Sequence, residues 1–207
     1  MDANRSTTKK SRPREGESRA MEELDLETVI ERARGHDTEA LGEIYRRYAG
    51  RVFGLCRYIL ESRENAEDAT GEVFLKLQRS IQSYDGSIPF PRWLLRVASN
   101  QCIDALRRRR RGQRLFAQLE AADAVLEPVS SEPSPLSVVL NAEEMAHVRD
   151  TIARLPQNYR VPLILRYYGE LSYDEIAKEL GVERNYVAAL IFHAKQALRR
   201  RLSQRSN

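Results

Sequence analysis

The 207-residue sequence has few of the residues that build metal sites and disulfides. Its only cysteines are Cys56 and Cys102, and its three histidines are His36, His147 and His193. None of these residues has the spacing of metal ligands, and each cysteine falls within a strongly apolar helical pattern. We therefore expect two reduced core thiols in a cytoplasmic protein, with no metal and no cofactor.

Long apolar runs are also missing, because arginine or glutamate interrupts the apolar stretches. A membrane-spanning helix needs about 20 apolar residues, so we expect no membrane insertion. The polar start of the chain carries lysines and arginines, and no apolar segment follows it as a secretory signal requires. Residues 1–23 are instead expected to form a disordered basic tail.

The common sequence signatures of enzymes are absent as well. There is no phosphate-binding loop, no glycine-rich dinucleotide pattern and no nucleophile motif. Carboxylate pairs such as Glu143 and Glu144 fall on helix faces that we expect to be exposed. Of the function classes considered, an enzyme fits this sequence least well.

Charge is abundant but nearly balanced. Lysine and arginine number 34 against 30 acidic residues, which gives a net charge of +4, and charged residues make up 31% of the chain against 7% aromatic. This composition is typical of a helix-rich protein with a solvated surface. The small net charge is a weak argument for an anionic partner, so the placement of the charges matters more than their sum.

Helical periodicity dominates the pattern, and no long segment alternates with period two. Three helices are predicted after Asp37, with Ser62 as the N-cap of the second and a turn at residues 84–87 before the third. The apolar stripe of the first helix runs through Leu41, Ile44, Tyr45, Tyr48, Val52, Leu55 and Ile59. We predict an all-α protein whose first domain is a helical bundle over residues 24–111.

A second helical domain is predicted over residues 138–207, after a flexible linker at 112–137 that is rich in proline and serine. Ser172 and Glu175 have the spacing of a capping box, and Gly181 ends the short helix that they begin. A longer amphipathic helix follows, so the pattern predicts a helix-turn-helix. In DNA-binding proteins the second helix of this motif enters the major groove, although a plain helical hairpin gives the same pattern.

A run of arginines, Arg107 to Arg111, ends the last helix of the first domain. No acidic cluster flanks the run in the sequence, so these side chains suit phosphates, whose neutralisation makes binding depend on salt. The alternative is a solvated helix end whose positive charge complements the helix dipole. We favour nucleic acid.

Aromatic residues gather just upstream of this run. Tyr84, Phe90 and Trp93 surround a turn that contains glycine and proline, and arginines lie between them. Aromatic faces beside cations suit the unpaired bases of single-stranded DNA. Taken alone, however, Trp93 fits a core position at least as well.

These residues resemble the sigma-70 family, in its extracytoplasmic-function (ECF) group. The family's second region is matched by Ala66-Glu67-Asp68-Ala69, by Glu72 to Leu77, and by Trp93 to Ala98 with the arginine run after it. Its fourth region is matched by Leu155-Pro156, by Val161 to Tyr167, and by Leu171 to Ala177. The resemblance covers about residues 37–111 and 138–202, with both motifs in the family's order.

The resemblance implies three binding surfaces. A surface that docks on the beta-prime clamp helices of core RNA polymerase is implied at Asp68, Glu72, Phe74, Leu75 and Leu77. A surface for the minus-ten element of promoter DNA is implied at Tyr84, Phe90, Arg92, Trp93, Arg96, Asn100, Asp104, Arg107 and Arg108. A surface for the minus-thirty-five element is implied at Ser172, Tyr173, Arg184, Asn185, Tyr186, Phe192, His193 and Lys195.

The implied function is to recruit polymerase to promoters and start transcription, with an anti-sigma factor as a further partner. The expected recognition helix departs from the family pattern, because Ala188, Ala189 and Leu190 stand where basic or hydroxyl side chains are usual. Alanine cannot make bidentate base contacts. The alternative is therefore a sigma-like interaction protein that binds polymerase or an anti-sigma factor with little minus-thirty-five readout.

Overall fold

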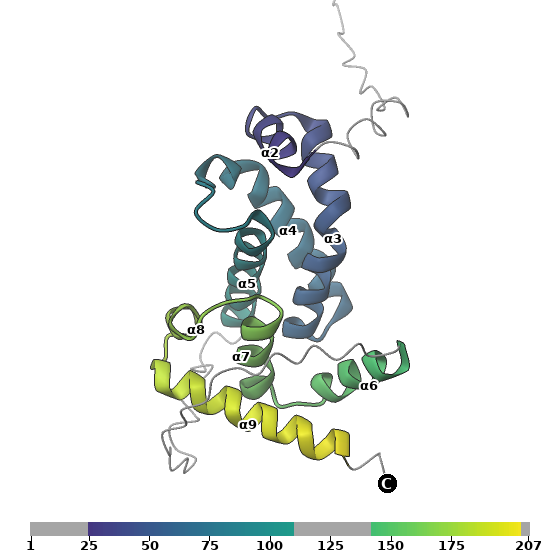
Figure 1. Ribbon diagram of the computed structural model, residues 1–207, viewed down its shortest axis with the longest axis vertical. Helices are drawn as coiled ribbons and strands as arrows, with labels where there is room; N and C mark the ends of the chain where they lie inside the picture. Colours follow the sequence, from purple (N-terminus) through teal and green to yellow (C-terminus); the bar gives the residue numbers. More distant parts are fainter. Residues whose placement is uncertain (1–24, 110–141, 204–207) are drawn as a thin grey trace, which may run out of the picture.

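The computed structural model describes residues 25–109 and 142–203, which form two groups of α-helices (Figure 1). The N-terminal group consists of α2 (Leu26–Arg34), α3 (Thr38–Leu60), α4 (Arg63–Ser80), the short 3-10 helix η1 (Ile81–Ser83) and α5 (Phe90–Arg109). The C-terminal group consists of α6 (Ala142–Ala153), α7 (Gln157–Tyr167), α8 (Tyr173–Leu180) and α9 (Arg184–Ser203). The described ranges contain no strand, so the all-α fold class is confirmed. The predicted tail and linker lie outside these ranges.

Side-chain caps fix where several of these helices begin. The Ser62 hydroxyl accepts a hydrogen bond from the Asn65 backbone N–H at 3.3 Å, which confirms the predicted cap of α4. At α8 the Ser172 hydroxyl accepts from the Glu175 N–H at 3.2 Å, and the Glu175 carboxylate accepts from the Ser172 N–H at 2.7 Å. This reciprocal pair is the predicted capping box. Gly181 ends the helix in the left-handed region, with φ of 71°.

The sequence pattern did not predict α2. Asp25 caps this helix by accepting from the Thr28 N–H at 2.9 Å, and Val29, Ile30 and Ala33 bury its inner face against α3 and η1. A helix of nine residues places only three side chains in the core, which is too few to stand out as a helical period.

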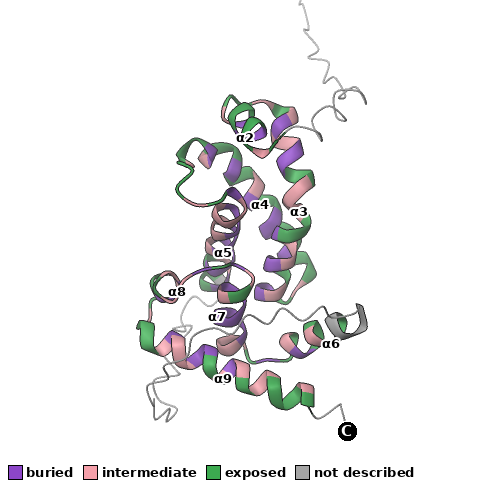
Figure 2. Ribbon diagram, in the orientation of Figure 1, coloured by how far each residue is buried: buried purple, intermediate pink, exposed green. Residues whose placement is uncertain are grey.

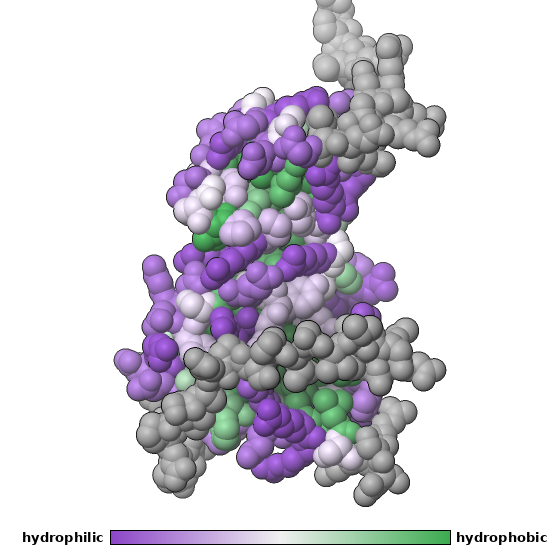
Figure 3. Space-filling view, in the orientation of Figure 1, coloured by the Kyte–Doolittle hydropathy of each residue, from purple (hydrophilic) through white to green (hydrophobic). Residues whose placement is uncertain are grey.

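The buried side chains form one continuous core that runs through both groups (Figure 2). In the N-terminal group α3 packs on α2, α4 and α5, and in the C-terminal group α7 and α8 both pack on α9. α3 also packs on α7, which joins the two groups. Polar side chains cover most of the face seen in Figure 3, and apolar ones show only in separate small areas. None of the helices in the described ranges has the length and apolar content to span a bilayer.

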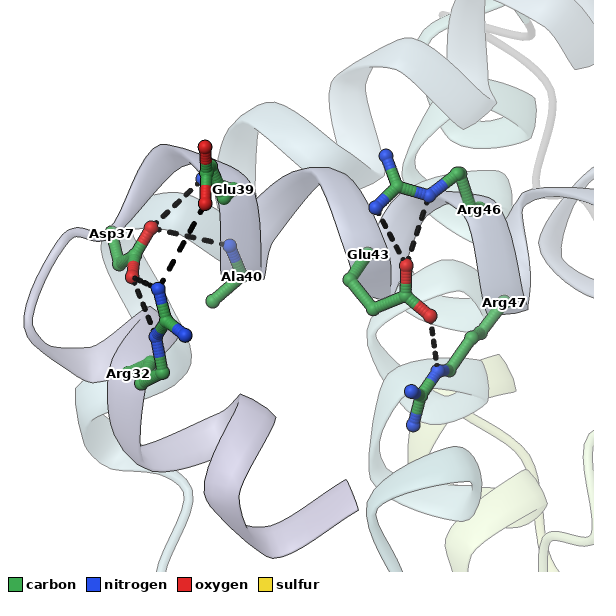
Figure 4. Close-up of polar contacts among 7 residues, drawn as sticks. All are labelled: Arg32, Asp37, Glu39, Ala40, Glu43, Arg46 and Arg47. Atoms are coloured by element: carbon green, nitrogen blue, oxygen red, sulfur yellow. Dashed lines mark hydrogen bonds and ion pairs between the residues drawn. The ribbon is translucent and has the colours of Figure 1, made fainter. Parts of the chain in front are cut away.

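One carboxylate is buried within the N-terminal group. The Glu43 side chain on α3 is 3% exposed and lies between Arg46 and Arg47 of the same helix (Figure 4). The Arg46 and Arg47 guanidinium groups approach its two oxygens to 2.6 Å each. Burial alone would raise the pKa of Glu43, but these two guanidinium groups outweigh it and hold the pKa below its ordinary value.

Candidate nucleic-acid interface

A row of polar side chains follows one face of α5. Arg92, Arg96, Asn100 and Asp104 recur every four residues, so they lie above one another on the helix, and Arg107 continues the row. The Arg92 and Arg96 side chains are each 37% exposed. All five were predicted from the sequence to contact the minus-ten element, and the helix brings them together. Arg108, also predicted, lies exposed on the neighbouring face.

The three predicted aromatic residues form one cluster at the start of α5. The Tyr84 ring lies 5.3 Å from the rings of both Phe90 and Trp93, and Phe90 lies 5.7 Å from Trp93. Phe90 is only 2% exposed, because it also packs against Tyr48 in the core. The expectation that Phe90 meets bases is therefore corrected: it supports the half-buried Tyr84 and Trp93 from beneath.

The Tyr84 turn is held from both sides. The Tyr84 hydroxyl donates to the Ile88 carbonyl at 2.8 Å, and Gly86 turns the chain with a φ of 77°. From α2, the Arg34 guanidinium donates to the Tyr84 carbonyl and lies 5.9 Å from the centre of its ring. Sequence reasoning missed Arg34, because nothing in the local pattern links residues 50 positions apart.

The predicted protein-docking surface lies on the outer face of α4. Asp68 and Glu72 are exposed, and Leu75 is 60% exposed, which is unusual for a leucine in a helix of this core. Leu77 is 1% exposed, so its expected contact is corrected to a core position. Phe74 is half-buried against Tyr45 of α3, with their ring centres 4.8 Å apart.

Tyr45 is a second correction, because the helical pattern placed it on the apolar stripe of its helix. The side chain is instead 51% exposed and packs edge-on against Phe74. Tyr45 of α3 and Phe74 of α4 thus add to the exposed apolar surface that Leu75 contributes. Ile44 is fully buried, whereas Tyr45, about 100° further round the helix, lies beyond the face that the neighbouring helices cover.

The helix-turn-helix presents the first turn of α9 to solvent. The Arg184 side chain is 56% exposed, pairs with Asp174 at 3.3 Å and lies 5.7 Å from the ring of Tyr173. Asn185 is exposed, whereas Ser172 is engaged in the capping box of α8. These contacts link the two helices of the motif and orient Arg184 outward.

The next turns of α9 carry few groups that could read bases. Leu190 is 3% exposed, so it is a core residue and not a replaced base contact. Ala188 and Ala189 are half-buried, and Phe192 is 38% exposed. His193 is half-buried, with its ring 5.5 Å from Phe192 and 6.2 Å from Tyr159. The other predicted residues of this surface, Tyr186 and Lys195, are also half-buried.

Comparison with known proteins identifies both helical groups. The sequence model of sigma-70 region 2 matches residues 44–112, and the model of sigma-70 region 4 matches residues 146–198. The ECF RNA polymerase sigma factor SigW of Bacillus subtilis is 28% identical over 183 residues, which cover 87% of this chain and 98% of SigW. SigE of Mycolicibacterium smegmatis is 32% identical over 165 residues, which cover 80% of this chain and 62% of SigE. The chain belongs to the ECF group of the sigma-70 family.

Solved structures share the fold of this ECF sigma factor. CnrH, in complex with the cytosolic domain of CnrY, superposes with a TM-score of 0.52 at 21% identity, covering 87% of this chain and 99% of CnrH. RpoE of Bartonella quintana, in complex with the anti-sigma factor NepR, superposes with a TM-score of 0.50 at 16% identity. The match covers 78% of this chain and 96% of RpoE. The prediction of a promoter-directing sigma factor is confirmed, with the N-terminal group as region 2 and the C-terminal group as region 4.

In this sigma factor the polar row of region 2 is occupied by region 4. The Arg96 guanidinium lies 3.0 Å and the Arg92 guanidinium 3.6 Å from the Glu175 carboxylate of α8. One turn further along α8, the Glu179 carboxylate lies 3.2 Å from the Asn100 side-chain amide and accepts its hydrogen bond when the amide nitrogen faces α8. The Arg107 guanidinium donates to the Glu179 carbonyl at 2.5 Å. Sequence reasoning assigned neither glutamate to this surface.

Glu175 is ionised in this setting. Partial burial would raise its pKa, but the backbone and hydroxyl hydrogen bonds from Ser172 and the charges of Arg96 and Arg92 outweigh burial. The pKa therefore lies below the ordinary glutamate value. The same carboxylate caps α8 and carries the negative charge that faces the two arginines.

Proposed function

We propose that this sigma factor binds core RNA polymerase through the outer face of α4 and captures the minus-ten element through α5 and the Tyr84 turn. The observation that carries the proposal is the polar row on α5, whose cations Arg92 and Arg96 flank the half-buried Trp93 along the helix, and Trp93 packs with Tyr84. Phosphates suit the cations, and unpaired bases suit the rings.

The proposed polymerase contact rests on the chemistry of α4. An exposed leucine one turn after two exposed carboxylates gives an apolar anchor with an acidic side, a composition that suits a protein-binding patch. Leu75→Asp removes the anchor without opening a cavity, since its side chain is mostly in solvent. We expect at least a tenfold loss of affinity for core polymerase and no loss of thermal stability. Gln78→Asp, at another exposed position of α4, is the control.

A reconstituted transcription assay tests the function as a whole. Core polymerase, this chain and a library of random DNA fragments are combined, and the 5′ ends of the transcripts are sequenced. Starts at discrete sites that share upstream sequences support the proposal. Tight binding to polymerase without initiation would favour the alternative, a sigma-like interaction protein.

The minus-ten surface is tested by Arg92→Ala/Arg96→Ala in the holoenzyme. Each lost phosphate contact should reduce the slope of log affinity against log salt by about 0.7 to 0.9. Arg149→Ala/Arg154→Ala removes the same charge from two exposed positions in region 4 and serves as the control. An unchanged salt slope in the first pair would contradict phosphate contact by this row.

Contact with the minus-thirty-five element is proposed for Arg184 and Asn185, at the exposed start of α9. The half-buried alanines after them cannot supply bidentate base contacts. We therefore expect weak sequence preference upstream, and promoter choice that rests mainly on region 2. Footprinting checks this expectation, and Arg184→Ala should shift the upstream preference if that arginine reads a base.

Two further expectations complete the proposal. Regions 2 and 4 are proposed to be separate domains over residues 24–111 and 138–207, so limited proteolysis should cut first within 112–137. An anti-sigma factor is the remaining proposed partner. Both structural neighbours were solved with such a protein or with a cytosolic partner domain, which supports this proposal.

A further inference from the structure

The Tyr84 turn joins η1 to α5, and its tip is open to solvent, with Asp85, Gly86 and Ser87 all exposed. Two of its hydrogen bonds are local. The Tyr84 hydroxyl donates to the Ile88 carbonyl at 2.8 Å, and the Ser87 N–H donates to the Asp85 carboxylate at 2.9 Å. Because both bonds join residues of the turn to one another, the orientation of the turn on region 2 depends on contacts with neighbouring elements.

The helix α2 supplies one such contact through Arg34. The Arg34 guanidinium donates to the Tyr84 carbonyl and lies 5.9 Å from the centre of the Tyr84 ring. The same guanidinium pairs with Glu31 one turn earlier on α2, which holds the arginine in place. A guanidinium can bond a carboxylate and a carbonyl together because its donors form a rigid planar fork. Arg34 therefore fixes both the backbone and the ring of Tyr84.

The segment just before the turn is also held by α2 and the residue pair after it. The Gln82 amide nitrogen of η1 lies 3.2 Å from the His36 Nε2. His36 has a φ of 60°, a conformation that residues other than glycine adopt only where their surroundings hold it. α2 also packs on η1, and Val29, Ile30 and Ile81 are buried there. These contacts fix η1 against α2.

The position of α2 is set in turn by α3. Arg32 of α2 pairs with Asp37 at 2.7 Å, and Asp37 caps α3 by accepting from the Glu39 N–H at 2.9 Å (Figure 4). α3 packs on α2, α4 and α5. A series of contacts thus leads from the cap of α3 through Arg32 and Arg34 to Tyr84.

Arg34 is engaged by the protein and does not offer its charge to a phosphate. Its side chain is 30% exposed and its Nε is buried, while Glu31 beside it is 67% exposed. The charge of Arg34 is therefore opposed by a carboxylate on the solvent side. Arg92 and Arg96, in contrast, lie on the α5 row that the proposed function assigns to phosphates. An arginine placed like Arg34 acts on the turn.

We propose that α2 positions the base-capturing turn, and that Arg34 is the positioning residue through which it acts. The proposal rests on the proposed function of the Tyr84 turn. A loop that is held before binding loses less conformational entropy when a base enters it, and it discriminates between bases because it cannot adapt to each of them. Arg34 thereby sets the affinity and the base preference at minus ten without touching DNA.

The test uses holoenzyme assembled from core polymerase and the full-length chain. The probes are fluorescein-labelled single-stranded oligonucleotides that carry the minus-ten sequence shared by the mapped transcription starts, and versions with one base exchanged. Arg34→Gln should weaken binding of the preferred sequence by about threefold to tenfold, measured by anisotropy, and bring it close to the exchanged sequences. The slope of log affinity against log salt should stay at the wild-type value, because no phosphate contact is lost.

Two further variants separate positioning from a general loss of structure. Arg34→Lys keeps the cation and one donor for the Tyr84 carbonyl, so it should restore part of the base preference. Arg63→Gln removes an arginine that is 80% exposed and, like Arg34, pairs with a glutamate of its own helix, so it is the matched control. Affinity for core polymerase and the circular dichroism of the free chain should match wild type in all three variants.

The proposal is overturned if Arg34→Gln keeps the wild-type base preference, or if it weakens all sequences equally. A salt slope that falls by about 0.7 to 0.9 would also overturn it, because Arg34 would then contact a phosphate itself. Failure of the proposed function is a separate result. Wild-type holoenzyme that binds preferred and exchanged sequences equally would reject base capture by the turn, and the positioning role of Arg34 with it.

Discussion

Among the residues that the structure describes, each region of this sigma factor buries one charged side chain, but the two charges are satisfied differently. In region 2 the Glu43 carboxylate pairs with Arg46 and Arg47, which lie on its own helix. In region 4 the Arg160 side chain is 1% exposed and reaches outside its own region. It donates to the Leu155 carbonyl at 2.8 Å, and also to the Tyr58 carbonyl of region 2 at 3.0 Å.

The buried charge of region 2 is paired within that region, whereas the buried charge of region 4 depends on contacts with region 2. Glu43 keeps both partners whether or not the regions are packed together. Arg160 loses the Tyr58 carbonyl if the two regions separate, together with its 2.5 Å ion pair to Glu61. Both regions give up these contacts, but the charge that is buried with them belongs to region 4. We infer that region 4 is the less stable half when the two regions are apart.

The largest expected effect comes from removing the shared charge. Arg160→Ala removes the donor from the backbone carbonyls of Tyr58, Ala153 and Leu155 and creates a cavity, which should lower the free energy of unfolding by about 2–4 kcal/mol. The loss should fall mainly on region 4. Urea unfolding followed by circular dichroism reports both regions, whereas the fluorescence of Trp93, the only tryptophan, reports region 2.

In this variant the dichroism transition should move to lower urea than the fluorescence transition. Arg154→Ala, which removes an arginine that is 71% exposed, should change stability by less than about 0.5 kcal/mol. Two transitions that shift together by equal amounts would show that Arg160 supports both regions alike, and the contrast drawn above would be wrong.

A smaller effect is expected from Glu43→Gln, and it should fall on region 2. The change keeps hydrogen-bond acceptors but removes the charge that faces two guanidinium groups, at a cost of about 1–2 kcal/mol at pH 7. The Trp93 fluorescence transition should move to lower urea. Glu39→Gln, a half-buried carboxylate four residues earlier on α3, is the control.

The Glu43 effect should depend on pH in a defined direction. The folded-state pKa of Glu43 is lowered, so its stabilisation is fully present above the ordinary glutamate pKa and is lost as the pH falls through the lowered value. The difference between wild type and Glu43→Gln should therefore shrink on acidification from neutral pH. A constant difference between pH 7 and pH 3 would show that packing, and not the ion pairs, accounts for the loss.

The sequence predicted what local rules decide. Helix starts at Ser62 and Ser172 follow from side chains that accept from N–H groups three residues away, and the structure has both caps. The residues of the α5 row were implied by the resemblance to the second region of the sigma-70 family, and the helix places them on one face. Two-region organisation followed from the proline-rich break between helical patterns.

What the sequence did not predict depends on contacts between distant residues. Tyr45 and Phe90 each sit on an amphipathic helix, and their exposure is set by which neighbouring helix covers that angle of the surface. The pairing of Glu175 with the α5 row joins residues 79 apart in sequence. The capping box alone accounts for a glutamate at position 175, so no local pattern indicates that its carboxylate has a second partner.

The smallest expected effect, and the only stabilising one, compares glycines of the two regions. Gly71 lies inside α4 of region 2 and an added Cβ would meet nothing within 4 Å, whereas Gly169 in region 4 is confined by Ser99. Gly71→Ala should raise the free energy of unfolding of region 2 by about 0.5–1 kcal/mol, because alanine loses less conformational entropy in a helix. It should leave compactness in solution unchanged, since position 71 is exposed and an added Cβ meets no neighbour. Gly71 adjoins Glu72 on the proposed polymerase surface, so affinity for core polymerase is measured in the same variant. Unchanged affinity marks this glycine as a tolerated weakness of a self-contained region. A loss of tenfold or more would mean that polymerase approaches the backbone of α4 at this point and that region 2 gives up stability for its partner.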